Sequence, residues 1–184
     1  FFQGFLLYQS VTHEENYNDF KSNYTNCLFL FDTRLILALI GLSSPEEEKS
    51  IQELTKLLLA YKAKIAFFDR TKDEVVGIIL DTAKNLNDTN IRTIKTALRA
   101  ARSKKISTAG LMQIKIEFVS TLNSKGIDQI DVPQRDPNYV IDERKLEELI
   151  NQEYDRERPP AANRHDIDCI AAIYQFREGK LTKK

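Results

Sequence analysis

The sequence contains 184 residues, of which 42% are hydrophobic, and its 27 Lys and Arg balance its 27 Asp and Glu. This length suits one domain with a sizeable core, and the hydrophobic fraction argues against intrinsic disorder. Because the net charge is zero, overall charge gives no reason to expect binding to nucleic acid. No apolar run approaches the roughly 18 residues of a membrane span, and the N-terminus has no secretory pattern. We therefore expect a folded cytoplasmic protein without a membrane partner.

Two strands and an intervening helix are predicted in the first part of the chain. Residues 27–31 and 64–68 are short apolar runs that each end at an Asp, which is typical of strands buried on both faces of a parallel sheet. Between them, Ser44 followed by Pro45 and Glu47 indicates the N-cap, first and third positions of a helix. The order strand, helix, strand predicts a right-handed parallel crossover.

The rest of the sequence is predicted to be mainly helical. Thr71 and Glu74 repeat the capping-box spacing, so a second helix is expected to begin at Thr71. Residues 126–133 are interpreted as a loop. Further helices are predicted over residues 91–105, 111–122, 142–158 and 166–177. The pattern as a whole predicts an α/β fold with more helix than strand.

Several carboxylates are expected near one edge of the predicted sheet. Asp32 and Asp69 follow the two strands, Glu74 lies in the next helix, and Asp166 and Asp168 lie at the start of the last helix. In open α/β sheets, ligands bind beyond the carboxyl ends of the strands. Carboxylates at this edge, without a Cys or His cluster, suit a hard cation such as Mg²⁺ or Mn²⁺. Two such ions can activate water and stabilise the leaving oxygen of a phosphodiester.

Each of these acids also has a purely structural interpretation. Asp32 could end a strand and begin a turn, and Glu74 could be occupied by its own capping box. Asp166 could be an N-cap and Asp168 a partner of the helix dipole, while His165 is interpreted as structural more readily than as a ligand. The two cysteines, Cys27 and Cys169, are interpreted as buried small hydrophobes because they lack metal-ligand spacing.

Three segments together resemble the PIN-like domain family: FLFDTRLILALIG (29–41), FFDRTKDEVVGIIL (67–80) and RHDIDCIAAIYQFREGK (164–180). The resemblance implies a Rossmann-like α/β/α sandwich around a central parallel sheet, over residues 27–184, with residues 1–26 as a lead-in. It also implies metal-dependent cleavage of RNA or, less often, DNA. Asp32, Glu74 and Asp166 match the family's first, second and third metal acids, and Asp168 competes for the third position.

The sequence departs from the family pattern in two places. Arg34 stands where an Asn usually follows Asp-Thr, which places a long cation close to the expected metal ions. The family's last strand would follow the helix over residues 166–177, whereas this sequence ends at Lys184. We therefore expect a fragment of a longer chain, truncated before that strand.

Basic residues are concentrated in the middle of the chain and acidic residues in a later segment. Over the predicted helix at 91–105, a stripe of cations lies beside an apolar stripe, and such a ridge could follow a phosphate backbone. A solvated face, or a surface for an acidic segment such as residues 131–157, explains the stripe equally well. The stripe consists of Arg92, Lys95, Arg99 and Arg102.

The leading hypothesis is a Mg²⁺- or Mn²⁺-dependent endoribonuclease that uses Asp32, Glu74 and Asp166. The expected partners are nucleic acid, RNA rather than DNA, and further copies or other domains of a longer protein. The main alternative is a PIN-like fold without catalysis that acts as an interaction or scaffold module, which Arg34 favours. A weaker alternative is a different phosphate enzyme that uses Asp32 or Asp69.

Overall fold

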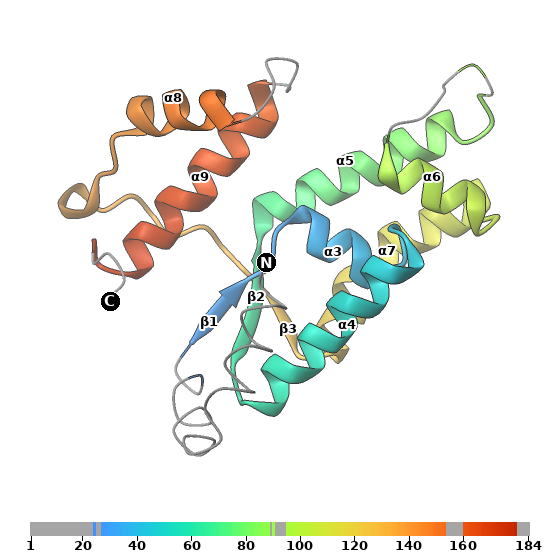
Figure 1. The fold of residues 1–184 in the computed structure, drawn as a ribbon, viewed down its shortest axis with the longest axis horizontal. Coiled ribbons are helices and arrows are strands. Elements are labelled where there is room, and N and C mark those ends of the chain that lie inside the picture. The colour runs from blue at the N-terminus through green and yellow to red at the C-terminus, as the bar shows by residue number, and fades with distance from the viewer. Residues whose placement is uncertain (1–23, 25–26, 89, 91–94, 154–159, 180–184) are drawn as a thin grey trace.

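Three parallel strands form the centre of the computed structural model, which describes residues 24, 27–88, 90, 95–153 and 160–179 (Figure 1). The strands are β1 (Leu28–Leu30), β2 (Lys64–Phe68) and β3 (Ile127–Ile130), in the order β1-β2-β3. Both pairings are parallel, with Leu30 opposite Ala66 and Phe68 opposite Ile130. The predicted α/β class with a parallel sheet is therefore confirmed.

Helices connect the strands and make up most of the described residues. Between β1 and β2 lie two helices, and between β2 and β3 lie three, all on one side of the sheet in Figure 1. Two further helices follow a short 3₁₀ turn, η2 (Pro137–Tyr139), and lie to the other side of the strands in the same view. In chain order the helices are α3 (Thr33–Leu39), α4 (Pro45–Ala60), α5 (Asp69–Asn85), α6 (Thr96–Ser103), α7 (Thr108–Ser124), α8 (Glu143–Glu153) and α9 (Pro160–Phe176).

The central strand β2 is predicted correctly, whereas β3 is not. Residues 65–68 of β2 are all buried, as expected for a strand covered on both faces. The prediction of a loop over residues 126–133 is wrong for residues 127–130, which form β3. Asp128 is exposed and only Ile127 is fully buried, which a strand at the edge of the sheet tolerates. Gly126, at φ 78°, makes the left-handed turn between α7 and β3.

The helix boundaries agree with the prediction where a local cap defines them. Ser44 is the N-cap of α4, its hydroxyl accepts from the amide of Glu47 at 3.3 Å, and Pro45 follows it, all as predicted. The predicted start at Thr71 is wrong, because α5 begins at Asp69. The last helix begins at Pro160, so it does not begin at residue 166 as predicted.

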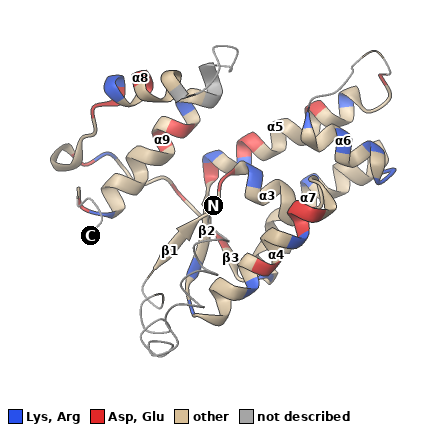
Figure 2. Cartoon of the chain, viewed as in Figure 1, with Lys and Arg blue, Asp and Glu red and all other residues tan. Residues whose placement is uncertain are grey.

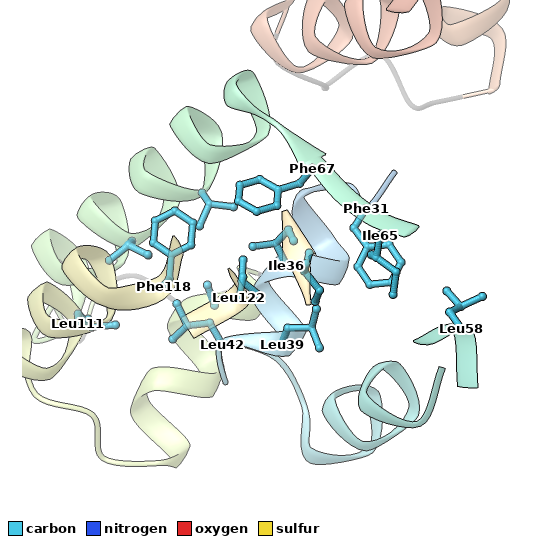
Figure 3. Close-up of a cluster of buried hydrophobic side chains, with 14 of the residues drawn as sticks. Phe31, Ile36, Leu39, Leu42, Leu58, Ile65, Phe67, Leu111, Phe118 and Leu122 are labelled. Carbon is cyan, nitrogen blue, oxygen red and sulfur yellow. The ribbon is translucent and has the colours of Figure 1, made fainter. Parts of the chain in front are cut away.

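The hydrophobic core lies between the sheet and helices α3 to α7 (Figure 3). Ile65 and Phe67 of β2 point into it and meet Ile36 of α3 and Phe118 and Leu122 of α7. All five are at most 2% exposed. Because side chains alternate along a strand, their neighbours on β2 face the other side of the sheet.

On that other side, β2 contacts the last helix. The ring of Phe68 stacks on Phe176 of α9, with centroids 6.2 Å apart and planes inclined by 2°. Phe68 itself is buried, while Phe176 is 47% exposed. The helix that carries Asp166 is therefore held against the carboxyl end of β2.

Removal of a core side chain should destabilise the protein far more than removal of the same side chain from the surface. Leu122→Ala should lower the free energy of unfolding by about 2–5 kcal/mol, because it removes a fully buried leucine from between α7 and the sheet. Leu149→Ala on α8, where leucine is 51% exposed, is the matched control and should cost less than about 1 kcal/mol. Urea denaturation measures both, and equal losses would contradict this location of the core.

Candidate active site

A pocket of about 1000 Å³ lies beside the first turns of α3 and α5. Four acids line it, from three different helices: Asp32 caps α3, Glu74 and Asp81 belong to α5, and Asp166 belongs to α9. Figure 2 shows acidic segments on both α5 and α9. The structure thus brings the three acids of the sequence hypothesis, Asp32, Glu74 and Asp166, to one pocket.

Asp32 lies directly after the chain leaves β1. Its backbone is extended, and its carboxylate accepts from the amide of Leu35 at 3.0 Å, so Asp32 is the N-cap of α3. Asp32 therefore caps a helix and does not begin a turn, as its structural interpretation supposed, and its carboxylate also faces the pocket. An N-cap carboxylate keeps unused lone pairs, because the cap consumes only one of them.

Glu74 contacts two residues that are distant in the sequence. The hydroxyl of Thr33, in the first turn of α3, donates to Glu74 Oε2, and His165 Nε2 of α9 lies 3.4 Å from the same oxygen. The interpretation of Glu74 as part of a capping box with Thr71 is wrong, because α5 begins two residues before Thr71. Glu74 therefore connects α5 to both α3 and α9.

Asp166 and Asp168 have different surroundings. Asp166 lies inside α9, six residues after its start, so its interpretation as an N-cap is wrong. Asp168 lies about 200° further round the helix and outside the pocket lining. Its side chain is 5% exposed, accepts from Arg70 Nη1, and lies 3.2 Å from Arg164 Nη2. Asp168 holds α9 against α5 and is not placed beside the other predicted metal acids.

Asp69 also lies apart from the pocket. It begins α5, and its Oδ1 accepts from the amide of Val132 at 3.4 Å, just after β3. The alternative of a phosphate enzyme built on Asp69 therefore has no support from the pocket lining.

Asp81 is a pocket acid that the sequence hypothesis missed. It lies seven residues after Glu74 on α5, and Gly77 and Ile78 between them line the same pocket. This i, i+3, i+4, i+7 spacing defines one face of a helix, so the sequence contained the signal. Lys95 lies 2.7 Å from Asp81 Oδ2 and also lines the pocket.

The predicted basic stripe does not form on one helix. Helix α6 begins at Thr96, so Lys95 precedes it, and Arg92 lies outside the described residues. Arg102 donates to the carbonyl oxygens of Asn85, Leu86 and Asp88 at 2.6–3.0 Å. Arg99 is exposed but does not line the pocket. Of the three described members of the stripe, only Lys95 lies at the pocket.

Arg34 lies at the pocket and is held in place by an acid of the next helix. Its Nε donates to Glu47 Oε1 at 2.5 Å, and the hydroxyl of Ser43 donates to Glu47 Oε2. The hydrogen bond from Ser43 lowers the pKa of Glu47; burial acts in the opposite direction, and Arg34 lowers it further. Glu47 is therefore ionised near neutral pH and holds the Nε side of the Arg34 guanidinium.

Cys169 lies behind His165, one turn further along α9. Its Sγ is 3.5 Å from His165 Nε2. Burial, followed by the negative charges of Asp166 and Glu74, raises the pKa of the Cys169 thiol to about 11. The thiol is therefore protonated at neutral pH, and a protonated thiol is a poor nucleophile and metal ligand.

The pocket offers the oxygen donors that a hard cation prefers, but they are not gathered round one point. Among the described residues, no three His, Cys, Asp or Glu side chains are grouped so that they could hold a metal ion. Asp32 uses one lone pair on the helix cap, and Oε2 of Glu74 is contacted by both Thr33 and His165. The donor chemistry fits Mg²⁺ or Mn²⁺, and a bound ion requires these side chains to rearrange.

Comparison with protein-family models, with curated proteins and with solved structures gives no match. Across the described ranges, none of the helices has the length and apolar character needed to cross a membrane. The function is therefore inferred from the geometry and chemistry of the pocket.

Neutralising Asp168 should loosen the attachment of α9. Asp168→Asn should lower the free energy of unfolding by about 1.5–3 kcal/mol, because it weakens charged hydrogen bonds to a buried carboxylate. Asp128→Asn, at an exposed position on β3, is the matched control and should change stability by less than about 0.5 kcal/mol. Chemical denaturation measures both variants. An Asp168→Asn protein as stable as its control would contradict the structural role of Asp168.

The raised pKa of Cys169 should appear as slow alkylation. In a Cys27→Ser background, labelling of Cys169 by iodoacetamide at pH 8 should be about 100-fold slower than for a thiol of ordinary pKa, because only the thiolate reacts. The rate should rise with pH towards a midpoint of about 11. Glu74→Gln should speed labelling, since the negative charge of Glu74 raises this pKa, whereas the exposed control Asp73→Asn should not. A midpoint near 9 would contradict this environment.

Proposed function

We propose that this chain is a PIN-like, metal-dependent endonuclease that hydrolyses phosphodiester bonds of single-stranded RNA in preference to DNA. The observation that carries the proposal is that Asp32, Glu74 and Asp166, from three separate helices, line one pocket. Asp32 and the start of α5 follow β1 and β2 directly, so the pocket lies at the carboxyl edge of a parallel sheet. Ligands bind at this edge in open α/β folds.

Asp32, Glu74 and Asp166 would hold Mg²⁺ or Mn²⁺ through their carboxylate oxygens. Such an ion activates water for attack on phosphorus and stabilises the leaving oxygen. Thr33 and His165 both approach Oε2 of Glu74, so they orient this carboxylate towards α3 and α9. Lys95, on the same pocket, adds a cation that attracts the phosphate backbone.

A second candidate function is a PIN-like interaction module without catalysis. The observation that favours it is the lack, among the residues described, of three grouped side chains able to hold a metal ion. The ion pair of Arg34 with Glu47 also places a cation at the pocket that would repel a metal ion. Metal binding distinguishes the two functions, because only the nuclease requires it.

The nuclease should cleave a 5′-labelled single-stranded RNA in the presence of Mn²⁺, and Asp32→Asn should abolish cleavage. Loss of an outer-shell group costs 10- to 100-fold in metal affinity or activity, so loss of a direct ligand should cost at least about 100-fold. Gel analysis of the products over time measures the rate.

Asp73→Asn is the matched control, because Asp73 is an exposed acid on α5 outside the pocket lining. It should cleave at the wild-type rate. Mn²⁺ should also raise the melting temperature of the wild type and of Asp73→Asn but not of Asp32→Asn. If Mn²⁺ changes neither the melting temperature nor the RNA, the interaction module is the better assignment.

A further inference from the structure

Arg34 is a pocket cation that is exposed and oriented at the same time. Its side chain is 79% exposed, yet its Nε is fixed by Glu47, which is itself held by the buried Ser43. Within the described part of the chain, no residue accepts from its two terminal nitrogens. The guanidinium therefore presents two donor groups in a defined direction.

The counter-charges distinguish Arg34 from Lys95. Lys95 pairs with Asp81, an acid that lines the pocket itself. Glu47, the partner of Arg34, lies outside the pocket lining, in the first turn of α4. Arg34 is thus the pocket cation whose neutralising partner stands away from the acids, and its free donors remain available to an incoming anion.

We propose that Arg34 binds a backbone phosphate of a single-stranded nucleic acid and positions the strand over the acidic pocket, and that Glu47 orients Arg34 for this contact. The inference rests on the proposed nuclease function, and it assigns a role to a residue that the sequence hypothesis treated only as an obstacle to metal binding. An arginine fork contacts a phosphate through two parallel hydrogen bonds, which a lysine cannot do. Four pocket acids repel a polyanion, so a fixed cation is needed to hold the strand.

Two members of the predicted basic stripe, Arg99 and Arg102, are not placed to contact a strand at the pocket. Arg102 uses its donors on three backbone carbonyl oxygens, and Arg99 lies away from the pocket. Arg34 lies two residues after Asp32, the N-cap of α3, and both residues line the pocket. The start of α3 would then contribute to binding both the strand and the metal ion.

The test is direct binding of a fluorescein-labelled single-stranded RNA, measured by anisotropy without added metal so that cleavage plays no part. Arg34→Ala should raise Kd about tenfold, because a charged hydrogen bond is lost, and should reduce the slope of log Kd against log salt by about one phosphate contact. Arg34→Lys should restore the salt slope but not the full affinity. Arg144→Ala is the matched control, since Arg144 is 91% exposed on α8 and outside the pocket.

Glu47→Gln tests the orienting role by the sign of its effect. If Glu47 orients Arg34, the variant should weaken binding about threefold, and the double variant Arg34→Ala/Glu47→Gln should bind no more weakly than Arg34→Ala alone. If Glu47 acts only as a negative charge, its removal should tighten binding to a polyanion and would overturn the orienting role. Melting temperatures near that of the wild type confirm that the variants fold.

The outcomes separate this inference from the proposed nuclease function. RNA binding that depends on Arg34, in a protein that Mn²⁺ does not activate, supports the inference and contradicts the nuclease. If the wild type cleaves RNA, but Arg34→Ala changes the Kd for RNA no more than Arg144→Ala does, the nuclease is supported and the inference is overturned. Absence of RNA binding by the wild type also overturns it.

Discussion

Burial of β2 on both faces is the constraint on which the pocket depends. One face of the strand, through Ile65 and Phe67, fixes the helices of the core, and the other, through Phe68, receives α9. The carboxyl ends of parallel strands lie at the same edge of a sheet. Asp32 and the first turn of α5, which follow β1 and β2, therefore lie side by side at that edge. The pocket is therefore a geometrical result of the sheet, and its chemistry is added by side chains that project from three helices.

Those side chains are tied to one another before any ligand arrives. Glu74 is contacted by Thr33 and His165. Arg34 pairs with Glu47, and Lys95 pairs with Asp81. Such pairing lowers the cost of placing several like charges in one pocket. It also means that a cation entering among the acids exchanges existing contacts for new ones, so its apparent affinity reports the difference between the two sets.

Local signals in the sequence predicted the fold well where a cap or an apolar run is sufficient by itself, as for β2 and for the start of α4 at Ser44. β3 was not predictable in this way, because two of its four residues, Asp128 and Gln129, are polar and only pairing with β2 defines the strand. The pocket acids were predicted from strand and helix ends, and Asp81 was available from its helical spacing to Glu74. The partners of Arg34 and Glu74 could not be predicted from the sequence, because they depend on how separate helices pack.

The attachment of α9 has a kinetic consequence. Thr33 and Glu74 are 41 residues apart, whereas the ion pair between Arg70 and Asp168 spans 98 residues. Loop-closure entropy rises with this separation, and contacts of high sequence separation slow folding. We therefore expect the sheet and its covering helices to assemble first and α9 to dock last. Asp166 then arrives with the final step of folding, so the pocket is completed only on a chain whose core is already formed.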